Sequence, residues 1–458
     1  MADNNDFLGT EPVGRLLVRL SIPAIAAQVV NLLYNLVDRV YIGHMPENGD
    51  LALTGLGVCM SVIMIVSAFA CFVSTGGAPR ASMAMGRGDR DEAERILGNS
   101  LTLQLIISAV LTAVLLLFNR PFLLAFGASE NTIGFATDYM NIYAVGTVFV
   151  QLTLGLNAFI TAQGFATTGM LSVLIGAACN IALDPVFIYG LDMGVQGAAL
   201  ATVLSQAVST VWVLWFLTGK KTILRVRREN LLLKKDVILP SFPLGLSTFI
   251  MQASESVILV CFNSSLLQYG GDPAVGAMTI LSSIMQFAML PTQGLGQGAQ
   301  PITSYNYGAG NASRVKRTFR LLLCCTLGYT MALWAAVMLF PAFFARIFVP
   351  DPELVAFTAW ALRIYCAAMG LFGAQIACQL TFTSIGYAKA AIMVAVMRKI
   401  ILLVPLIYIL PNFFADKTMA VYLAEPVADF LSVVFAVTLF TVQFRKAMAR
   451  LESGQETA

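Results

Sequence analysis

Four residues with oxygen-bearing side chains stand inside long apolar stretches of the sequence: Asp38, Asn180, Asp184 and Thr202. Asn180 precedes Asp184 by four residues, so the two share one face of a helix. Carboxylate, amide and hydroxyl oxygens suit a proton or a hard cation such as sodium. Two carboxylates in one apolar site do not easily both carry charge, which favours proton exchange near neutral pH. The group therefore predicts a cation-coupling site, with Na⁺ as a transient ligand of Asp38 and Asp184.

The same two acids also have a purely structural explanation. Asp38 would then pair with the adjacent Arg39 or cap a helix end, and Asp184 with Pro185 would only close a helix. A charge at the centre of a bilayer costs at least about 2.5–3.5 kcal/mol, so under either explanation each acid needs a partner.

A second set of ionisable residues lies in the other half of the chain. Glu255 is the one acid of its apolar stretch and has no basic neighbour there, so as a lone carboxylate it is a candidate for cation coupling or for attracting a cationic substrate. A satisfied polar contact between helices is the alternative. Arg398 and Lys399 are predicted to form internal salt bridges with Glu425 and Asp429, a role in gating being the alternative.

Glutamines are the remaining polar side chains that a membrane cleft would use for a substrate. The candidates for its wall are Gln252, Gln293, Gln297, Gln300 and Gln375.

Motifs of enzymes and metal sites are absent from the sequence. It contains no Walker motif, no nucleophile elbow and no set of metal ligands, so no enzyme activity, fixed metal or cofactor is expected.

Composition identifies the surroundings of these residues. Of the 458 residues, 58% are hydrophobic and 12% charged, whereas a soluble domain carries roughly 25% charged residues. The mean hydropathy is +0.78, so a lipid bilayer is the expected surroundings. The net charge of +3 gives no reason to expect a nucleic-acid partner.

The apolar stretches are long enough to span a membrane, which takes about 20 apolar residues for a helix. The sequence therefore predicts an all-α polytopic membrane protein with twelve transmembrane helices. Their expected ranges are 17–42, 52–74, 97–118, 136–158, 168–188, 195–217, 238–262, 274–298, 319–340, 357–380, 389–410 and 418–441.

Basic residues fix the expected orientation. With the N-terminus inside, the outside segments hold only Arg120, Arg346 and Lys417, and the inside segments hold the great majority of the lysines and arginines. The positive-inside rule then places both termini in the cytoplasm. The polar, acidic stretch Met1–Phe7 lacks the basic region of a signal peptide, so the first apolar segment is expected to be retained as a helix.

An internal repeat divides the chain. Adding 222 to a position in the first half repeatedly gives the same residue type, as at Gly76 and Gly298 or Gly86 and Gly308. The repeat spans six helices, an even number, so the two halves are parallel repeats with a cleft between them. We expect an N-terminal lobe at 1–219, a basic cytoplasmic linker at 220–236 and a C-terminal lobe at 237–458. Rocking of two such lobes is the physical basis of transport by alternating access.

The chain resembles the multidrug and toxic compound extrusion (MATE) family in its bacterial branch, over essentially its whole length. The segments that carry the resemblance are Asp38-Arg-Val-Tyr-Ile-Gly43 after Pro23, Gly86-Arg-Gly-Asp89, Asn180-Ile-Ala-Leu-Asp-Pro185, Gly197-Ala-Ala-Leu-Ala-Thr202 and Tyr305-Asn-Tyr-Gly-Ala-Gly310. The resemblance implies V-shaped lobes and export of amphipathic, often cationic, drugs in exchange for H⁺ or Na⁺. It also implies that the four N-terminal polar residues form the family's cation site. Some branches of the family carry a second acid near Gln375 and Gln379, which is absent here.

Two other functions are weighed against export. A flippase for lipid-linked saccharides has the same broad architecture and would use cations such as Arg398 for pyrophosphate. A non-transporting membrane receptor is the second, but duplicated lobes argue against it. The expected partners are small molecules and membrane lipids, and the protein is expected to be a monomer in a bacterial cytoplasmic membrane.

Overall fold

The computed structural model describes residues 7–45 and 49–453, and within them it contains helices and no strand. The first half consists of α1 (Phe7–Thr10), α2 (Val13–Gly43), α3 (Gly49–Gly86), α4 (Arg90–Ala125), α5 (Ile133–Ala162), α6 (Ala166–Pro185), the π-helix η1 (Val186–Gly190) and α7 (Gly194–Thr218). The second half consists of η2 (Arg228–Asn230), α8 (Lys235–Ile238), α9 (Phe242–Gly308), α10 (Ala312–Leu339), α11 (Pro341–Arg346), α12 (Pro352–Tyr365), α13 (Met369–Ser384), α14 (Ala388–Val396), the π-helix η3 (Met397–Leu403), α15 (Val404–Ile409), η4 (Leu410–Asn412) and α16 (Lys417–Glu452).

The predicted polytopic helical fold is confirmed, and each of the twelve predicted segments overlaps a helix. Among the described residues, ten helices are long and apolar enough to cross a membrane, and α12 with α13, bent by 50°, makes an eleventh span. The predicted number of twelve spans is reached because α9, which is 67 residues long and counts as one of the ten helices, contains two predicted spans. The predicted separation of the two spans between residues 262 and 274 is confirmed, because the helix is interrupted within that interval. The break is the single residue Gly271, whose φ of 66° suits a glycine.

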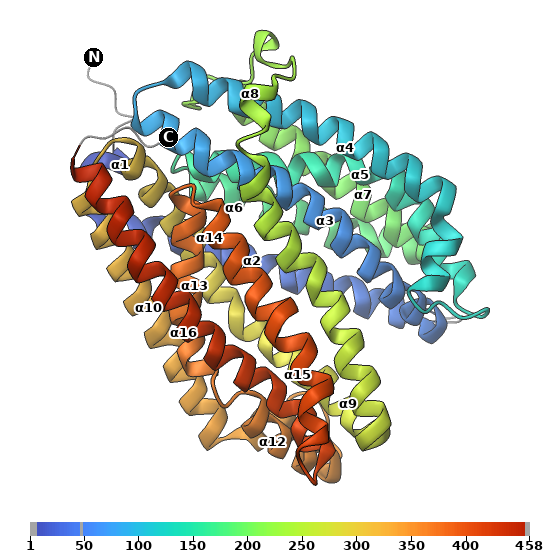
Figure 1. Ribbon diagram of the computed structural model, residues 1–458. Helices are drawn as coiled ribbons and strands as arrows, with labels where there is room; N and C mark the ends of the chain where they lie inside the picture. The colour runs from blue at the N-terminus through green and yellow to red at the C-terminus, as the bar shows by residue number, and fades with distance from the viewer. Residues whose placement is uncertain (1–6, 46–48, 454–458) are drawn as a thin grey trace.

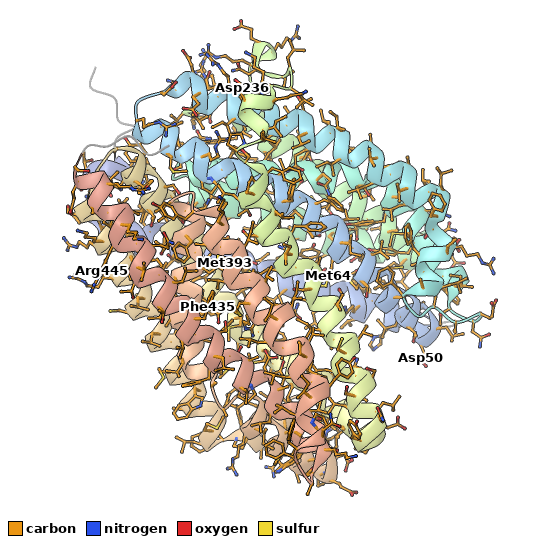
Figure 2. The ribbon with its side chains drawn as sticks, viewed as in Figure 1. Asp50, Met64, Asp236, Met393, Phe435 and Arg445 are labelled. Carbon is orange, nitrogen blue, oxygen red and sulfur yellow. The ribbon has the colours of Figure 1, made fainter. Side chains whose placement is uncertain are left out.

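The middle of the molecule is largely apolar and its ends carry charge, as a membrane requires. Figure 2 shows Asp236 and Arg445 near one end and Asp50 at the other, while Met64, Met393 and Phe435 lie between.

The internal repeat is visible in the backbone. Gly88 (φ 80°) turns the chain before α4, and Gly310 (φ 74°) does the same before α10. The next residues cap the helices: Asp89 accepts a hydrogen bond from the Glu92 amide, and Asn311 accepts one from the Arg314 amide. The same sequence offset therefore reproduces the same turn and cap in both halves.

The two lobes diverge from a shared end. In Figure 1, α2–α7 and α9–α16 run together near α1 and the C-terminal end of α16, and they separate toward the opposite end. Helices α3 and α9 cross at the shared end with almost no side chain between them. A Cβ on Gly86 would meet the Tyr305 carbonyl, and a Cβ on Gly308 would meet the Met83 carbonyl. Glycine at these repeat-related positions therefore brings the two backbones into contact.

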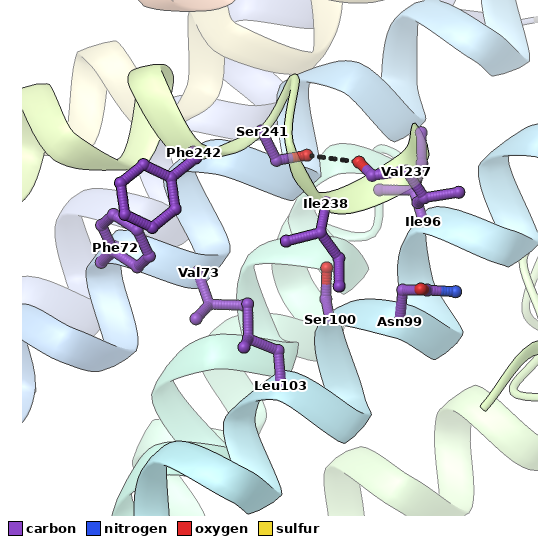
Figure 3. Close-up of a pocket in the computed structure, with 10 residues that line it drawn as sticks. All are labelled: Phe72, Val73, Ile96, Asn99, Ser100, Leu103, Val237, Ile238, Ser241 and Phe242. Carbon is purple, nitrogen blue, oxygen red and sulfur yellow. Dashed lines mark hydrogen bonds between the residues drawn. The ribbon is translucent and has the colours of Figure 1, made fainter. Parts of the chain in front are cut away.

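In each lobe, the first turns of one helix pack against the other lobe. Phe242 of α9 packs on Phe72 of α3 with ring centroids 4.8 Å apart, and Arg80 of α3 donates hydrogen bonds to the Val237 carbonyl and the Ser241 hydroxyl, both at 2.6 Å. Figure 3 shows the small pocket that Phe72, Val237, Ser241 and Phe242 line together with residues of α4.

The first half of α2 is carried by the C-terminal lobe in the corresponding way. Leu16 and Leu20 are buried in one apolar cluster with Ala299 and Ile302 of α9. The helix starts are thus exchanged between the lobes at their shared end.

The basic segment 220–236 is folded onto the N-terminal lobe. The buried Gln163 side-chain oxygen accepts hydrogen bonds from the Thr222 hydroxyl and from the Ile223 and Leu224 amides, at 2.8–2.9 Å. Glu94, which is 1% exposed, forms an ion pair with Arg227 at 2.7 Å. The segment therefore packs as part of the first lobe up to α8. The division of the chain into 1–219, 220–236 and 237–458 stays a prediction.

We predict that Gly86→Ala lowers the thermal stability of the purified protein, whereas Gly57→Ala in the same helix leaves it unchanged or raises it slightly. The new methyl at position 86 meets the Tyr305 carbonyl, but nothing lies within 4 Å of a Cβ at position 57. Overpacking costs about 1–3 kcal/mol, and Ala is favoured over Gly inside a helix by up to about 1 kcal/mol. Fluorescence-detected melting in detergent measures both variants, and equal melting temperatures would contradict the close approach of α3 and α9.

Candidate functional site

Three of the predicted site residues form one cluster inside the N-terminal lobe. Asn180 and Asp184 lie one turn apart on α6, and Thr202 lies on α7. The Asn180 amide nitrogen lies 3.4 Å from an Asp184 carboxylate oxygen and 3.5 Å from the Thr202 hydroxyl, to both of which it donates. Asp184 has no exposed surface and Asn180 is 1% exposed. The structure therefore brings these three side chains together.

Asp38, the fourth predicted residue, reaches the same region from α2. It is 4% exposed and close enough to Asp184 for the two carboxylates to interact electrostatically. It does not cap its helix, which continues to Gly43. The four residues thus come from α2, α6 and α7 and lie in the interior of the first lobe.

Several oxygens of this cluster have no donor. Within the described part of the chain, no hydrogen bond reaches Asp38 Oδ1, Asn180 Oδ1 or Asp184 Oδ2, although all three atoms are buried. Buried polar atoms in proteins are normally satisfied. All three accept hydrogen bonds or ligate cations and none can donate while the acids are ionised. The arrangement is therefore suited to a proton or a small hard cation.

Two tyrosines of this site were not predicted. The Tyr139 side chain on α5 interacts with Asp38 and Thr202, and Tyr34 on α2 interacts with Asp38 and Gln206. Tyr34 precedes Asp38 by four residues, so helical spacing could have found it. No sequence signal connects Tyr139 with α2, because only the packing of α5 places it there.

The C-terminal lobe contains the second set of ionisable residues, and it is an ion-pair network. Arg398 donates to Asp429 at 2.7 Å and to Glu425 at 2.8 Å, so the predicted salt bridges of Arg398 are confirmed. Lys399 instead binds Glu255 at 2.6 Å. The expectation of a lone carboxylate at Glu255 is therefore wrong, because its partner comes from a helix 144 residues further along the chain.

The glutamines proposed for the cleft wall lie in different surroundings. Gln293 and Gln297 are exposed and one turn apart on α9, and Gln300 is half-buried. Gln252 is half-buried and its side chain interacts with Cys71 of the first lobe. Gln375 is buried on α13 and accepts a hydrogen bond from Ser432 at 2.7 Å. Whether any of them contacts a substrate stays a prediction.

Comparison with known proteins decides the family. The sequence model of the MatE family matches the chain twice, over residues 23–186 and 246–409. The chain belongs to the MatE family. The two matches are equally long and fall one in each half, in agreement with the internal repeat.

Relatives of similar length support this assignment. The multidrug export protein MepA of Staphylococcus haemolyticus is 22% identical, with 93% of each chain covered. A protein named FAD transporter from Shewanella oneidensis is 24% identical, over 94% of this chain and 95% of that one. A crystal structure of MATE in the bent conformation superimposes with a TM-score of 0.92 at 22% identity and covers both chains completely. The fold is therefore that of MATE transporters, with two repeated lobes.

We predict that Arg398→Met destabilises the protein far more than Arg19→Met. Removal of the buried guanidinium leaves Glu425 and Asp429 unpaired, a change that typically costs about 3–5 kcal/mol. Arg19 forms an exposed ion pair with Glu11, and exposed pairs contribute about 0–1 kcal/mol. Thermal unfolding in detergent compares the two variants. Equal stability would show that the buried network is not needed for folding.

Proposed function

We propose that this MatE-family member is a secondary active exporter that exchanges amphipathic small molecules, often cationic, for H⁺ or Na⁺. The observation that carries the proposal is the set of buried, donor-less oxygens on Asp38, Asn180 and Asp184. Oxygen atoms held in an apolar lobe without a partner are a place where a small cation binds and leaves.

Alternating access is the mechanism proposed for the two lobes. They meet at the glycine contacts between α3 and α9 and diverge beyond them. Loading Asp38 and Asp184 with a cation changes the charge of the first lobe, which alters the balance between conformations that open to opposite sides. Movement of the cation down its gradient across the membrane then supplies the free energy for outward movement of the cargo.

The cargo is proposed from the named relatives. MepA is a multidrug export protein and another relative is an FAD transporter, so family members of this length differ in what they carry. We propose drug-like amphipaths for this chain, transported without a cofactor by a monomer in a bacterial cytoplasmic membrane, with both termini in the cytoplasm.

The flippase alternative is not favoured. It requires a cation available to a pyrophosphate group, and the strongest candidate was Arg398. That guanidinium is already engaged, since its edge binds Glu425 and Asp429 and one of its faces lies over Phe372, with 4.4 Å to the ring centroid. A saccharide pyrophosphate would have to displace two carboxylates to reach it.

We predict that Asp38→Asn and Asp184→Asn each abolish dye efflux from cells while the protein is still made and inserted. An amide cannot exchange a proton and binds Na⁺ more weakly than a carboxylate, so the driving ion is lost. Asp138→Asn is the matched control because Asp138 is exposed on α5. Unimpaired efflux in both site variants would refute the coupling site.

The coupling ion is identified by transport in everted membrane vesicles. We predict that a proton gradient or a sodium gradient, acid or Na⁺-rich inside, drives uptake of a dye into the vesicles, and that Asp38→Asn removes the response. The two gradients are imposed separately, with an ionophore for each as control. Dye uptake that responds to neither ion would overturn the proposal of antiport.

A further inference from the structure

Glu255 and Lys399 form the one mid-membrane ion pair among the described residues in which the acid is accessible and the base is not. The Glu255 side chain is 54% exposed and the Lys399 side chain 7%. A carboxylate is too costly to expose to hydrocarbon, so this surface faces water between the lobes. Gln252, one turn earlier on α9, already interacts with Cys71 of the other lobe. Glu255 is therefore an acid that a cargo molecule can reach.

The network behind this acid has an unequal number of charges. It contains three carboxylates, on Glu255, Glu425 and Asp429, and two cations, on Arg398 and Lys399. One negative charge is therefore in excess when all five groups are ionised. A single added positive charge would make the network neutral, which favours a monocation over an anion of the same shape.

Lys399 has a second carboxylate within its electrostatic reach. It interacts with Glu425 as well as with Glu255. Glu425 uses one carboxylate oxygen for Arg398, and the other, Oε2, is buried and accepts no hydrogen bond from the described residues. The lysine side chain is long and flexible, with three donors on its ammonium group. Glu425 Oε2 is therefore available to accept a hydrogen bond from the Lys399 ammonium group when Lys399 leaves Glu255.

We infer that Lys399 is a tethered competitor for the cargo site: it occupies Glu255 while the site is empty and moves to Glu425 when a monocationic amphipath binds Glu255. The inference rests on the proposed export function and adds a residue that sets specificity within it. Lys399 keeps the accessible acid paired between cargoes, and its return to Glu255 displaces the bound cation. The lysine therefore weakens cargo binding and speeds cargo release.

The test uses three probes of nearly the same shape: tetraphenylphosphonium, neutral triphenylphosphine oxide and anionic tetraphenylborate. Their binding to the full-length chain in nanodiscs is measured by equilibrium dialysis, with empty nanodiscs subtracted. We expect Lys399→Met to bind tetraphenylphosphonium about tenfold more tightly, the gain that about 1.4 kcal/mol of removed competition gives. Affinity for the neutral probe should not change, and tetraphenylborate should bind the wild-type chain more weakly than the cation.

Four further variants separate competition from a structural role. Glu255→Gln should weaken tetraphenylphosphonium binding at least tenfold and leave the neutral probe unaffected. In the Glu255→Gln background, Lys399→Met should give no gain, because the two changes act on one interaction. Lys399→Arg keeps the competing charge and should bind like the wild type. Lys417→Met, which removes a cation lying over Tyr269 at 5.3 Å, is the matched control and should change nothing.

The outcomes distinguish the inference from the proposed function. Unchanged or weaker tetraphenylphosphonium binding by Lys399→Met, with the neutral probe still bound and exported, overturns the competitor and leaves the export function standing. A tenfold gain that persists in the Glu255→Gln background also overturns it, since the lysine would then act elsewhere. Failure of the wild-type chain to bind or export any of the three probes overturns both proposals.

Discussion

The cost of an unpaired charge in hydrocarbon is the constraint on which the rest of this structure depends. The C-terminal lobe meets it by pairing, since Arg398 binds two acids and Lys399 binds a third. The N-terminal lobe contains Asp38 and Asp184 with no lysine or arginine ion-paired to either of them in the described chain. An acid in such surroundings needs a counter-charge, and the proposed coupling ion is the counter-charge that the first lobe lacks among its own side chains.

The repeat shows that the two halves share a scaffold and differ in their charges. Pro185 and Pro405 are related by the repeat, and each lies near a π-helix: η1 begins directly after Pro185, and η3 ends two residues before Pro405. The residue before the first proline is Asp184, and the residue before the second is Val404. Irregular turns of this kind are frequent at functional sites. The repeat-related positions therefore hold a buried acid in one lobe and an apolar side chain in the other.

Local sequence patterns were sufficient for the spans, the repeat and the pairing of neighbours. Asn180 and Asp184 could be placed together because helical spacing relates them, and Arg398 could be matched to Glu425 and Asp429 because their helices are adjacent. The partner of Glu255 could not be predicted, since the contact depends on how α9 packs against η3 across 144 residues. Helix lengths also escaped prediction. Hydropathy measures only the part of a helix inside the bilayer, whereas α9 runs on to a break that depends on the conformation of Gly271.

The exchanged helix starts explain why the second charged set lies where it does. Phe249 of α9 still packs on Phe69 of the first lobe, with ring centroids 4.9 Å apart, whereas Ile258 belongs to the core of the second lobe. Glu255 lies between them, on the segment where α9 passes from one lobe to the other. Any change in the angle between the lobes must bend or shift this segment, because its two ends are held by different bodies. The accessible acid thus lies on the segment that joins the two lobes, so the proposed lobe motion and the inferred cargo binding involve the same few residues.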